Sequence, residues 1–451
     1  MSVSNLIITD ILSNYDIMCI IDFLDDIDKI NFLKSNTSLY SLIDNVVFTR
    51  IYNYDLINRV NKKFRYVKYE ISDYNINQKI PDIVTHIDVN TSNIITNKFL
   101  NNIIHIHFKQ EFYQNTKNLL PDNLRELIID NYNYYQNTDV FFPKSLSYLK
   151  IINYHVPLKI NTLLCNITVL DLGHYYGNIT GLIPPSVKTL KINCKNFTGY
   201  FPATIETLIL GDTFNSKIKA RLPENLLNLK LGNQFNKSIN HLPECLQTLK
   251  IGTNFNKSIK YLPHKLEKLI FGKDSKFMYS VRGILPRTLK ILKFGAHFNQ
   301  DIEDCFPNGL IKLEFGDIFN MPIKRKIKIR KCVPPIFKMF NIKKFLPNSL
   351  EYVKFGMYFN QSINNAIPTN MRKIILGIHY NKIISHVPKN LTYVELNMGF
   401  RFGIGKSLKN ITHIKIPKTL YSYYLKDLPK HEILTNKNYS FSDSLIIKIN
   451  Q

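Results

Sequence analysis

The sequence contains no tryptophan, and its six cysteines stand singly. No Cys-x-x-Cys pair occurs, and no histidine lies at the spacing that a zinc site requires. These absences argue against a disulfide framework and a structural zinc site, and they are typical of a cytosolic protein with reduced thiols. The cysteines are Cys19, Cys165, Cys194, Cys245, Cys305 and Cys332.

Long apolar runs are also absent, since no stretch reaches the roughly 18 apolar residues of a membrane span. The N-terminal segment has no basic stretch leading into an apolar one, because Asp10, Asp16 and Asp22 interrupt it. We therefore expect neither a secretory leader nor a membrane partner. The expected location is the cytoplasm, that of the host cell if the protein is viral, with the nucleus as an alternative.

Acidic residues are few: 34 Asp and Glu stand against 59 Lys and Arg, which gives a formal net charge of +25. This charge favours acidic partners, whether proteins, nucleic acids or anionic membranes, and it does not select among them. Apolar residues make up 45% of the 451 residues, as in an ordinary folded protein.

The most informative feature is a repeat with a period of about 21 residues, clear from Pro202 onward. The block Leu222 to Ile239 returns almost unchanged as Leu242 to Ile259. A unit this short cannot bury a core alone, so neighbouring units must stack into a solenoid. We expect about fourteen coils between residue 80 and the C-terminus.

Each coil combines a short strand with turn residues. Counted from the proline of the repeat, apolar residues at positions six and eight predict a strand with one buried face. The glycine at position nine is expected to permit a turn. A Phe-Asn pair then recurs, as in Phe235-Asn236; we expect the ring to pack inside and the buried amide to bond the backbone of adjacent coils.

The pattern Phe-Asn-x-x-Ile-x-x-x-Leu-Pro, joined to Leu-x-x-Leu-x-[Leu/Ile/Phe]-Gly, resembles the FNIP repeat. This repeat is a short relative of leucine-rich repeats, found in social amoebae and in giant DNA viruses of amoebae. The resemblance covers about Pro121 to Phe400, and the coil at Phe277-Met278 departs from it. It implies a leucine-rich-repeat-like solenoid with a parallel β-sheet on one face.

Residues 1–50 carry no repeat and predict a small helical unit. Apolar residues spaced by three and four, beginning at Ile17, indicate an amphipathic helix, and Asp25 to Asp28 supply caps before a second one. The segment resembles an F-box, although Tyr15 replaces the usual proline. The resemblance implies docking on a Skp1-type adaptor protein through Ile17, Ile20, Ile21, Phe23 and Leu24; the alternative is a simple N-terminal cap.

These patterns divide the chain into four parts. We expect an F-box-like helical unit over 1–50 and a linker or N-terminal cap over 51–80. The repeat solenoid is expected over 81–400, with an irregular basic stretch at 321–345, and degenerate coils with a C-terminal cap over 401–451.

No pattern in the chain predicts catalysis, a cofactor or a metal. The closest histidines, His105 and His107, share one face of a strand and lack a recognisable third ligand. The stretch Gly399 to Ser407 ends like a phosphate-binding loop, but Phe400 stands where that loop needs glycine. We therefore expect a protein that is not an enzyme.

The outward positions of the strands are rich in lysine. Positions five and seven after the proline face away from the core, on the sheet side where solenoids usually bind partners. Solubility of a lysine-rich protein is the alternative explanation. The candidate binding face consists of Lys150, Lys191, Lys230, Lys250, Lys293, Lys354, Tyr148 and Tyr352.

The irregular stretch 321–345 is strongly basic and contains no acidic residue. Its structure is expected to be either a decayed coil or an insertion that projects as a cationic loop. Such a loop suits nucleic acid, an acidic protein or a nuclear-import receptor, and a merely solvated loop is the alternative. The candidate basic loop contains Lys324, Arg325, Lys326, Lys328, Arg330 and Lys331.

Together these features predict a non-enzymatic substrate-recognition adaptor. The F-box-like unit would dock on a Skp1/cullin-type ubiquitin ligase, and the solenoid would bind a target protein that the sequence does not identify. The main alternative is a basic solenoid that binds nucleic acid or an acidic protein, with no link to ubiquitin. A purely structural interaction module is a third possibility.

Overall fold

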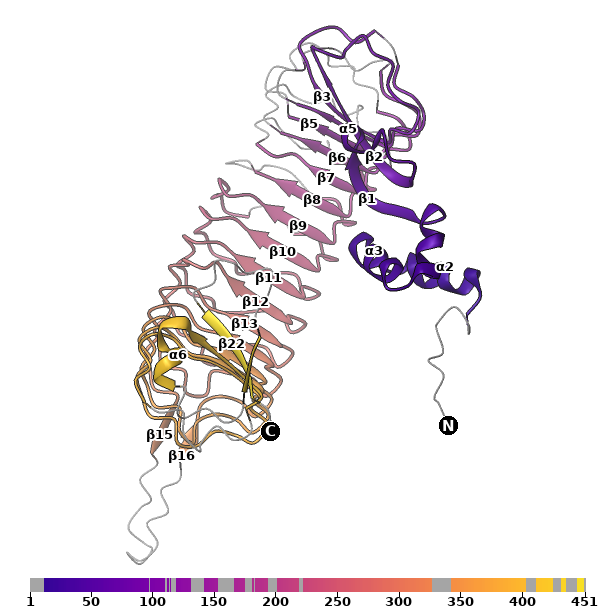
Figure 1. Ribbon diagram of the computed structural model, residues 1–451. Coiled ribbons are helices and arrows are strands. Elements are labelled where there is room, and N and C mark those ends of the chain that lie inside the picture. Colours follow the sequence, from indigo (N-terminus) through magenta and orange to yellow (C-terminus); the bar gives the residue numbers. More distant parts are fainter. Residues whose placement is uncertain are drawn as a thin grey trace, which may run out of the picture. The chain divides into compact units, whose positions relative to one another are not determined.

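The computed structural model describes residues 12–96, 98–109, 112, 114, 119–130, 142–152, 166–174, 181, 183–193, 201–218, 222–326, 342–402, 411–424, 431–434 and 444–449 (Figure 1). The chain divides into two compact units, Met1–Val187 and Lys188–Gln451. Both are built mainly of short parallel strands, and the first also carries the N-terminal helices. The predicted fold class, a repeat solenoid preceded by a small helical unit, is confirmed.

The helical unit consists of α2 (Asn14–Asp22), α3 (Asp26–Lys34), α4 (Thr37–Tyr40) and the short 3-10 helix η1 (Ser41–Asp44). Ser13 and Asp16 form a capping box at the start of α2. Asp25 caps α3 by accepting hydrogen bonds from the backbone N–H groups of Ile27 and Asp28. The core of this unit contains Ile17, Ile21, Leu33, Leu39, Leu42, Val46 and Phe48.

The sheet of the first unit begins directly after these helices. Each strand pairs in parallel with the next, and the short helix α5 (Tyr54–Ile57) lies between the first two. Strands therefore already occur within the segment 51–80. The strands are β1 (Val47–Asn53), β2 (Lys63–Ser72), β3 (His86–Asn90), β4 (His105–Phe108), β5 (Glu126–Ile129), β6 (Tyr148–Ile151) and β7 (Val169–Asp171).

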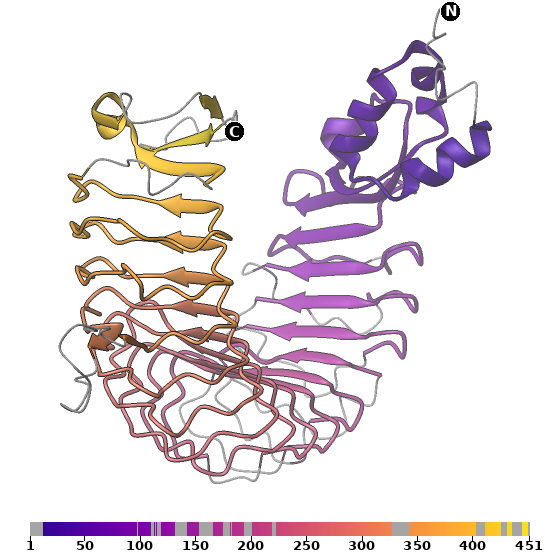
Figure 2. The same cartoon turned by 90° about the horizontal axis from the view of Figure 1, so that it is seen from below.

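The second unit continues the same pattern: its earlier strands lie one above another in Figure 1, and its later, orange strands do so in Figure 2. Neighbours in the sequence pair in parallel, except that β14 pairs with β17. The strands are β8 (Thr189–Ile192), β9 (Thr207–Leu210), β10 (Asn228–Leu231), β11 (Thr248–Ile251), β12 (Lys268–Phe271), β13 (Ile291–Lys293), β14 (Lys312–Glu314), β17 (Tyr352–Lys354), β18 (Lys373–Ile375), β19 (Tyr393–Glu395) and β20 (His413–Pro417).

The C-terminal end of this sheet changes direction. After β20 the chain forms α6 (Lys418–Tyr424), β21 (His431–Leu434) and β22 (Ser444–Ile449). Strand β22 pairs antiparallel with both β20 and β21. It thereby occupies the edge that β20 would otherwise expose, and exposed edges are sites of unwanted strand pairing.

The phenylalanines of the repeat pack inside the second unit, as predicted, and there they form a stacked column. The rings of Phe235 and Phe255 are nearly parallel, at 6°, with centroids 6.3 Å apart, and both side chains are fully buried. The column continues through the irregular coil, because Phe277 stacks between Phe255 and Phe298 at 6.1 and 6.3 Å. Burial of these large rings supplies much of the core that a single coil lacks.

The asparagines of the Phe-Asn pairs form a second column. The backbone N–H of Asn256 donates to Oδ1 of Asn236 at 3.0 Å, and Asn381 donates to Asn360 in the same way at 2.9 Å. The predicted bonding between coils is confirmed, although these side chains are half-buried or, at Asn381, exposed, rather than buried. Where Met278 replaces asparagine the column breaks, and Oδ1 of Asn256 is left buried without a hydrogen-bond partner.

The repeated glycine serves a different purpose from the predicted one. Among the described residues, positive φ angles at glycine occur only at Gly173, Gly181 and Gly283, and none of the second unit's strand-end glycines has one. A Cβ atom on Gly316 would instead lie 1.8 Å from the carbonyl oxygen of Gly295 in the preceding coil. Close approach of stacked backbones therefore requires the glycine.

The basic stretch is an insertion rather than a decayed coil. Strands β15 (Lys324–Lys326) and β16 (Ile342–Lys344) pair with each other in an antiparallel hairpin. The coils on either side contact each other directly, since Phe319 stacks on Phe359 with centroids 6.0 Å apart. The insertion therefore leaves the stack of coils continuous.

Candidate binding surfaces

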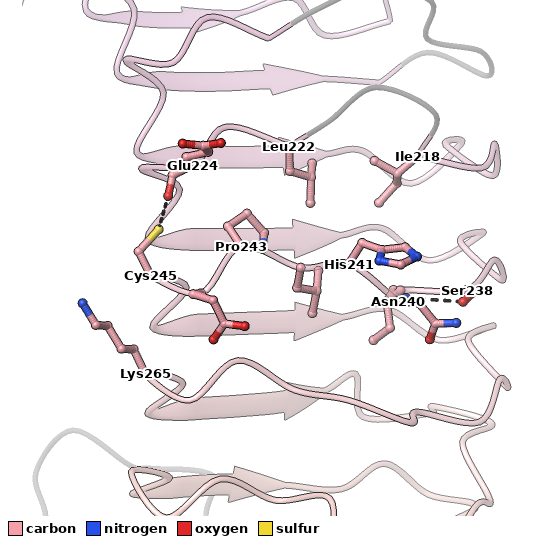
Figure 3. Close-up of a pocket in the computed structure, with 12 residues that line it drawn as sticks. Ile218, Leu222, Glu224, Ser238, Asn240, His241, Pro243, Cys245 and Lys265 are labelled. Carbon is pink, nitrogen blue, oxygen red and sulfur yellow. Dashed lines mark hydrogen bonds between the residues drawn. The ribbon is translucent and has the colours of Figure 1, made fainter.

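A pocket of about 770 Å³ in the second unit brings a thiol, an imidazole and carboxylates together (Figure 3). Cys245 and His241 lie on opposite sides of Pro243. The thiol donates hydrogen bonds to the backbone carbonyls of Glu224 and Leu226, the latter at 3.2 Å. No hydrogen bond joins Cys245 to His241 in this part of the chain, so the pocket holds no nucleophile–base pair.

The Cys245 thiol occupies a position that other coils fill with hydroxyl groups. Ser145 and Thr288, each two residues after a repeat proline, also donate to two carbonyls of the preceding coil. Ser349 donates to the Leu310 carbonyl at 2.7 Å. Burial raises the pKa of the Cys245 thiol, which keeps it in the protonated, donating form. Cys245 is therefore a structural donor.

The histidines of β4 are engaged in pairs with acidic residues. His105 and His107 lie on one face of the strand, as the alternation predicted, and both are partly exposed. Nδ1 of His105 lies 2.9 Å from Glu126, and Nε2 of His107 lies 2.7 Å from Asp130. Within the described ranges, no three His, Cys, Asp or Glu side chains are placed to hold a metal ion. Residues 403–407 of the loop-like stretch lie outside those ranges.

The five predicted docking residues of the helical unit fall into two groups, buried and exposed. Ile17 and Ile21 are fully buried in its own core, so they stabilise the fold and are not available to a partner. Ile20 is 38% exposed, Phe23 is 92% exposed and Leu24 is half-buried. Their assignment to one docking face is therefore corrected by the three-helix packing, which turns the first two inward.

Ile27, which sequence reasoning missed, joins the exposed residues. It is the second residue of α3 and is 54% exposed. We give the name α2–α3 apolar patch to Ile20, Phe23, Leu24 and Ile27, the exposed or half-buried apolar residues where α2 ends and α3 begins. The signal for Ile27 in the sequence is its place two residues after the cap Asp25, in the first turn of α3.

Asp26 and Lys29, a buried ion pair within α3 at 3.6 Å, attach this helix to the first strand through hydrogen bonds. Asp26 is 2% exposed and accepts hydrogen bonds from the backbone N–H groups of Thr49 and Arg50, at 2.9 and 2.7 Å, and from the hydroxyl of Tyr52. Burial alone would raise the Asp26 pKa, but these donors hold it below its usual value. The ammonium group of Lys29, also buried, donates to the Val47 carbonyl at 2.8 Å.

The sheet face of the first unit carries a compensated charge network. Asp88 is buried and lies 2.7 Å from Lys68 and 3.3 Å from Lys109, which also pairs with Glu70 at 2.8 Å. Burial opposes ionisation of Asp88, and the two ammonium groups outweigh it and lower the pKa. Further along this face, the predicted Tyr148 and Lys150 of β6 are both partly exposed.

In the second unit the predicted lysines fall into register. Lys230 pairs directly with Lys250, and Ile270 pairs with Lys293. The first two are exposed, whereas Lys293 lies 3.4 Å from Glu314. The remaining members stand in the same two columns of outward residues: Lys191 is partly exposed, Lys354 is exposed and Tyr352 is partly exposed.

At the later strands, lysines interact with carboxylates and aromatic rings of the same sheet face. Lys312 pairs with Glu314 at 2.9 Å and lies 4.5 Å from the ring centroid of Tyr352. Lys373 lies 4.0 Å from the ring centroid of Tyr393. Burial, with the nearby Glu314 carboxylate, raises the pKa of Tyr352 to about 12. These lysines therefore already have partners within the sheet face.

The base of the inserted hairpin is tied to the preceding coil by acidic residues. Arg325 lies 2.8 Å from Glu303, and Lys343 lies 2.8 Å from Glu303 and 2.7 Å from Asp304. Lys324 donates to the Asn364 carbonyl. The side chain of Lys326, together with the whole of Lys328, Arg330 and Lys331, lies outside the described residues.

No described helix has the length and apolarity that a bilayer span requires; the longest, α2 and α3, have nine residues each.

Comparisons with known proteins show which family this chain resembles. Residues 235–274, 281–318, 298–327 and 340–379 match the family described as FNIP Repeat. Over 447 residues the chain is 39% identical to FNIP repeat-containing protein L170 of Acanthamoeba polyphaga mimivirus, an alignment that covers 98% of this chain and 99% of that protein. The chain thus matches this relative over nearly its full length.

Two further similarities concern parts of the chain. F-box protein L166 of the same virus is 30% identical over 115 residues in the N-terminal part, which is 25% of this chain and 44% of that protein. The crystal structure of CroV588, described as a novel circular LRR protein, is 25% identical with a TM-score of 0.57 and covers 82% of this chain. This chain spans 59% of that structure, less than two thirds of it. By its repeats and its nearly full-length relative, the chain belongs to the FNIP repeat-containing proteins, whose coils here form a leucine-rich-repeat-like solenoid.

Proposed function

We propose that this protein is a non-enzymatic substrate-recognition adaptor. Its N-terminal helical unit, within residues 1–50, docks on a Skp1/cullin-type ubiquitin ligase, and its solenoid binds a target protein in the host cell cytoplasm. Ubiquitin transfer itself belongs to the partners. The fold and the family are those of binding scaffolds, and the N-terminal similarity to an F-box protein supports the docking role.

The observation that carries the proposal is the α2–α3 apolar patch. Phe23 is 92% exposed and Ile27 is 54% exposed, although the helical unit has a well-formed core beneath them. Large apolar side chains gathered on a soluble surface mark sites that a partner covers. Aromatic residues such as Phe23 are also enriched at the centres of interfaces.

The test is capture of a Skp1-type protein by the full-length chain. Phe23→Asp and Ile27→Asp are expected to abolish capture, because each places a carboxylate in the apolar contact. Tyr74→Asp is the matched control, since Tyr74 is 98% exposed in the same unit and lies outside the patch. Lack of capture by the unmodified chain, or equal capture by all four proteins, would contradict the docking role.

A second assay separates the adaptor from a purely structural interaction module. A protein captured by the solenoid in cells is expected to gain ubiquitin when the unmodified chain is present, and to lose it with Phe23→Asp. Stable capture with ubiquitin levels that the Phe23 variant does not change would favour the structural module.

A further inference from the structure

Two kinds of lysine occupy the sheet face of the second unit. On β13, β14 and β18 the lysines have carboxylate or aromatic partners within the face, as Lys312 has Glu314. On β10 to β12 the exposed lysines are Lys230, Lys250 and Lys268. None of these three has an acidic side chain within ion-pairing distance among the described residues.

The uncompensated lysines lie next to one another. Lys230 and Lys250 are direct partners on neighbouring parallel strands, whose spacing is about 4.8 Å. Lys268 pairs with Thr248, so it lies diagonally beside Lys250. Like charges directly opposite each other destabilise a sheet. The ammonium groups of these lysines therefore repel one another, and an acidic ligand would reduce that repulsion.

Lys250 and Lys268 line an open depression of about 540 Å³ that crosses five strands, β10 to β14, and Lys230 lies beside it as the strand partner of Lys250. The lining of the depression combines Lys250 and Lys268 with the partly exposed aliphatic residues Ile270 and Ile291. The Glu314 carboxylate also lines it and is already paired with Lys293 and Lys312. Thr248 adds a hydroxyl group. A ligand that fits must therefore present carboxylates together with short aliphatic side chains.

We propose that this depression, with Lys230, Lys250 and Lys268, is the site where the solenoid binds an acidic, partly aliphatic peptide segment of its target. The inference rests on the proposed adaptor function and adds the chemical class of the target segment. Carboxylates of the segment pair with the three ammonium groups, and its aliphatic side chains cover Ile270 and Ile291.

A peptide fits these residues better than a nucleic acid does. The depression contains no arginine, the residue best suited to bidentate phosphate contacts. It also contains no aromatic ring on which a base stacks. The nearest rings on the described face, Tyr352 and Tyr393, are already covered by Lys312 and Lys373.

The test measures binding of a fluorescein-labelled peptide of alternating Glu and Val to the full-length chain by fluorescence anisotropy. Combined Lys230→Gln, Lys250→Gln and Lys268→Gln substitutions are expected to weaken binding about tenfold or more, because three exposed ion pairs are lost. The matched control replaces Lys257, Lys260 and Lys276 with glutamine, which removes the same charge from exposed positions outside the sheet face. It is expected to change binding less than about twofold. A peptide of alternating Gln and Val is expected not to bind.

Three results would overturn the inference: no binding of the acidic peptide, equal weakening in both triple variants, or single-stranded DNA that binds more tightly than the peptide through the same three lysines. Circular dichroism checks that each variant is folded. Capture of the Skp1-type protein is measured on the same samples. Peptide failure with intact capture contradicts this inference alone, whereas lost capture with intact peptide binding contradicts the docking role alone.

Discussion

At the scale of single residues, polar side chains of this protein stabilise the fold by reaching the neighbouring coil. The thiol of Cys245 and the hydroxyls of Ser145 and Thr288 donate to carbonyls of the preceding coil. Such bonds satisfy turn carbonyls that the strand ladder does not reach. Stability is therefore sensitive to whether a donor is present and insensitive to its chemical type.

This view gives a prediction for Cys245. Cys245→Ser is expected to leave the free energy of unfolding nearly unchanged, because serine already fills the same position in other coils. Cys245→Ala removes the donor and is expected to cost about 1 kcal/mol. Denaturant titration of both variants checks the difference; equal losses in the two would show that the hydrogen bonds contribute nothing.

The burial of His86 predicts that the stability of the first unit depends on pH. Burial, helped by the neighbouring His105, lowers the pKa of His86 to about 4, and the two rings stack at 5.1 Å. Between an unfolded pKa of about 6.5 and this folded value, only the unfolded chain binds the proton, so stability falls as pH falls. Lowering the pH from 7 to about 5 should therefore reduce the free energy of unfolding, and His86→Gln should make that reduction smaller by up to about 2 kcal/mol.

The matched control is His413→Gln. Thr412 and His413 repeat the arrangement of Thr85 and His86, with 2.9 Å between hydroxyl and Nδ1 in both, but His413 is partly exposed. Thermal unfolding of the three proteins at both pH values measures the effect. The same pH response in all three would refute the role of the buried imidazole.

At the scale of the strand, the spacing of coils is set by backbone contact. Gly316→Ala would force its Cβ against the Gly295 carbonyl oxygen, and is expected to cost about 3 kcal/mol or more. At Gly272 the nearest heavy atom to a new Cβ is 3.5 Å away. Gly272→Ala is therefore expected to be neutral or to stabilise by about 0.5 kcal/mol. Urea unfolding compares them, and similar losses would contradict the contact.

The helix α3 contains a buried ion pair between Asp26 and Lys29, at 3.6 Å, and hydrogen bonds of both residues hold the helix to the first strand. Asp26→Asn leaves the buried Lys29 ammonium without a counter-charge and is expected to destabilise the helical unit by about 3–5 kcal/mol. Hydrogen exchange should then rise in α2 and α3 while β10 to β12 keep their protection. Asp28→Asn, at an exposed position of the same helix, is the control. Unchanged exchange in the Asp26 variant would count against the ion pair.

At the scale of the whole molecule, the two proposed surfaces differ in chemistry. The α2–α3 apolar patch relies on buried area, whereas the lysine site relies on charge, and salt screens only the second. Raising the salt concentration from about 0.1 M to about 1 M shortens the Debye length from about 10 to about 3 Å. Acidic-peptide binding should then weaken strongly while capture of the Skp1-type protein changes little; parallel loss of both would contradict this assignment.

The sequence predicted the solenoid well because each coil repeats the same local solution. Leu229 and Leu231 face inward by simple alternation, and the register of their strand follows from stacking identical units. The predicted role of the repeated glycine, to permit a turn, was wrong, because a period in the sequence does not reveal how closely neighbouring backbones approach. The helical unit was harder, since spacing alone gives an apolar face and only the packing decides that Ile17 and Ile21 turn inward while Ile27 stays outside.

The candidate site was predictable only in outline. Alternation identified the lysine columns, but Glu314 and Tyr352 compensate some members through neighbours about 20 and 40 residues away in the chain. Which lysines remain uncompensated depends on those cross-strand pairs. Likewise, only the direct pairing of β14 with β17 shows that the irregular stretch 321–345 is an insertion rather than a coil.

The antiparallel strand β22 bears on how such a chain gains length. It pairs with β20 in the opposite direction, so the parallel pairing of the coils stops at β20, and before the first coils Asp26 fastens α3 to β1. Interior coils, by contrast, share the same phenylalanine and glycine contacts with whichever neighbour stands next to them. Gene duplication in the interior can therefore add coils that enlarge the sheet face and leave both the β20–β22 pairing and the α3–β1 hydrogen bonds unchanged.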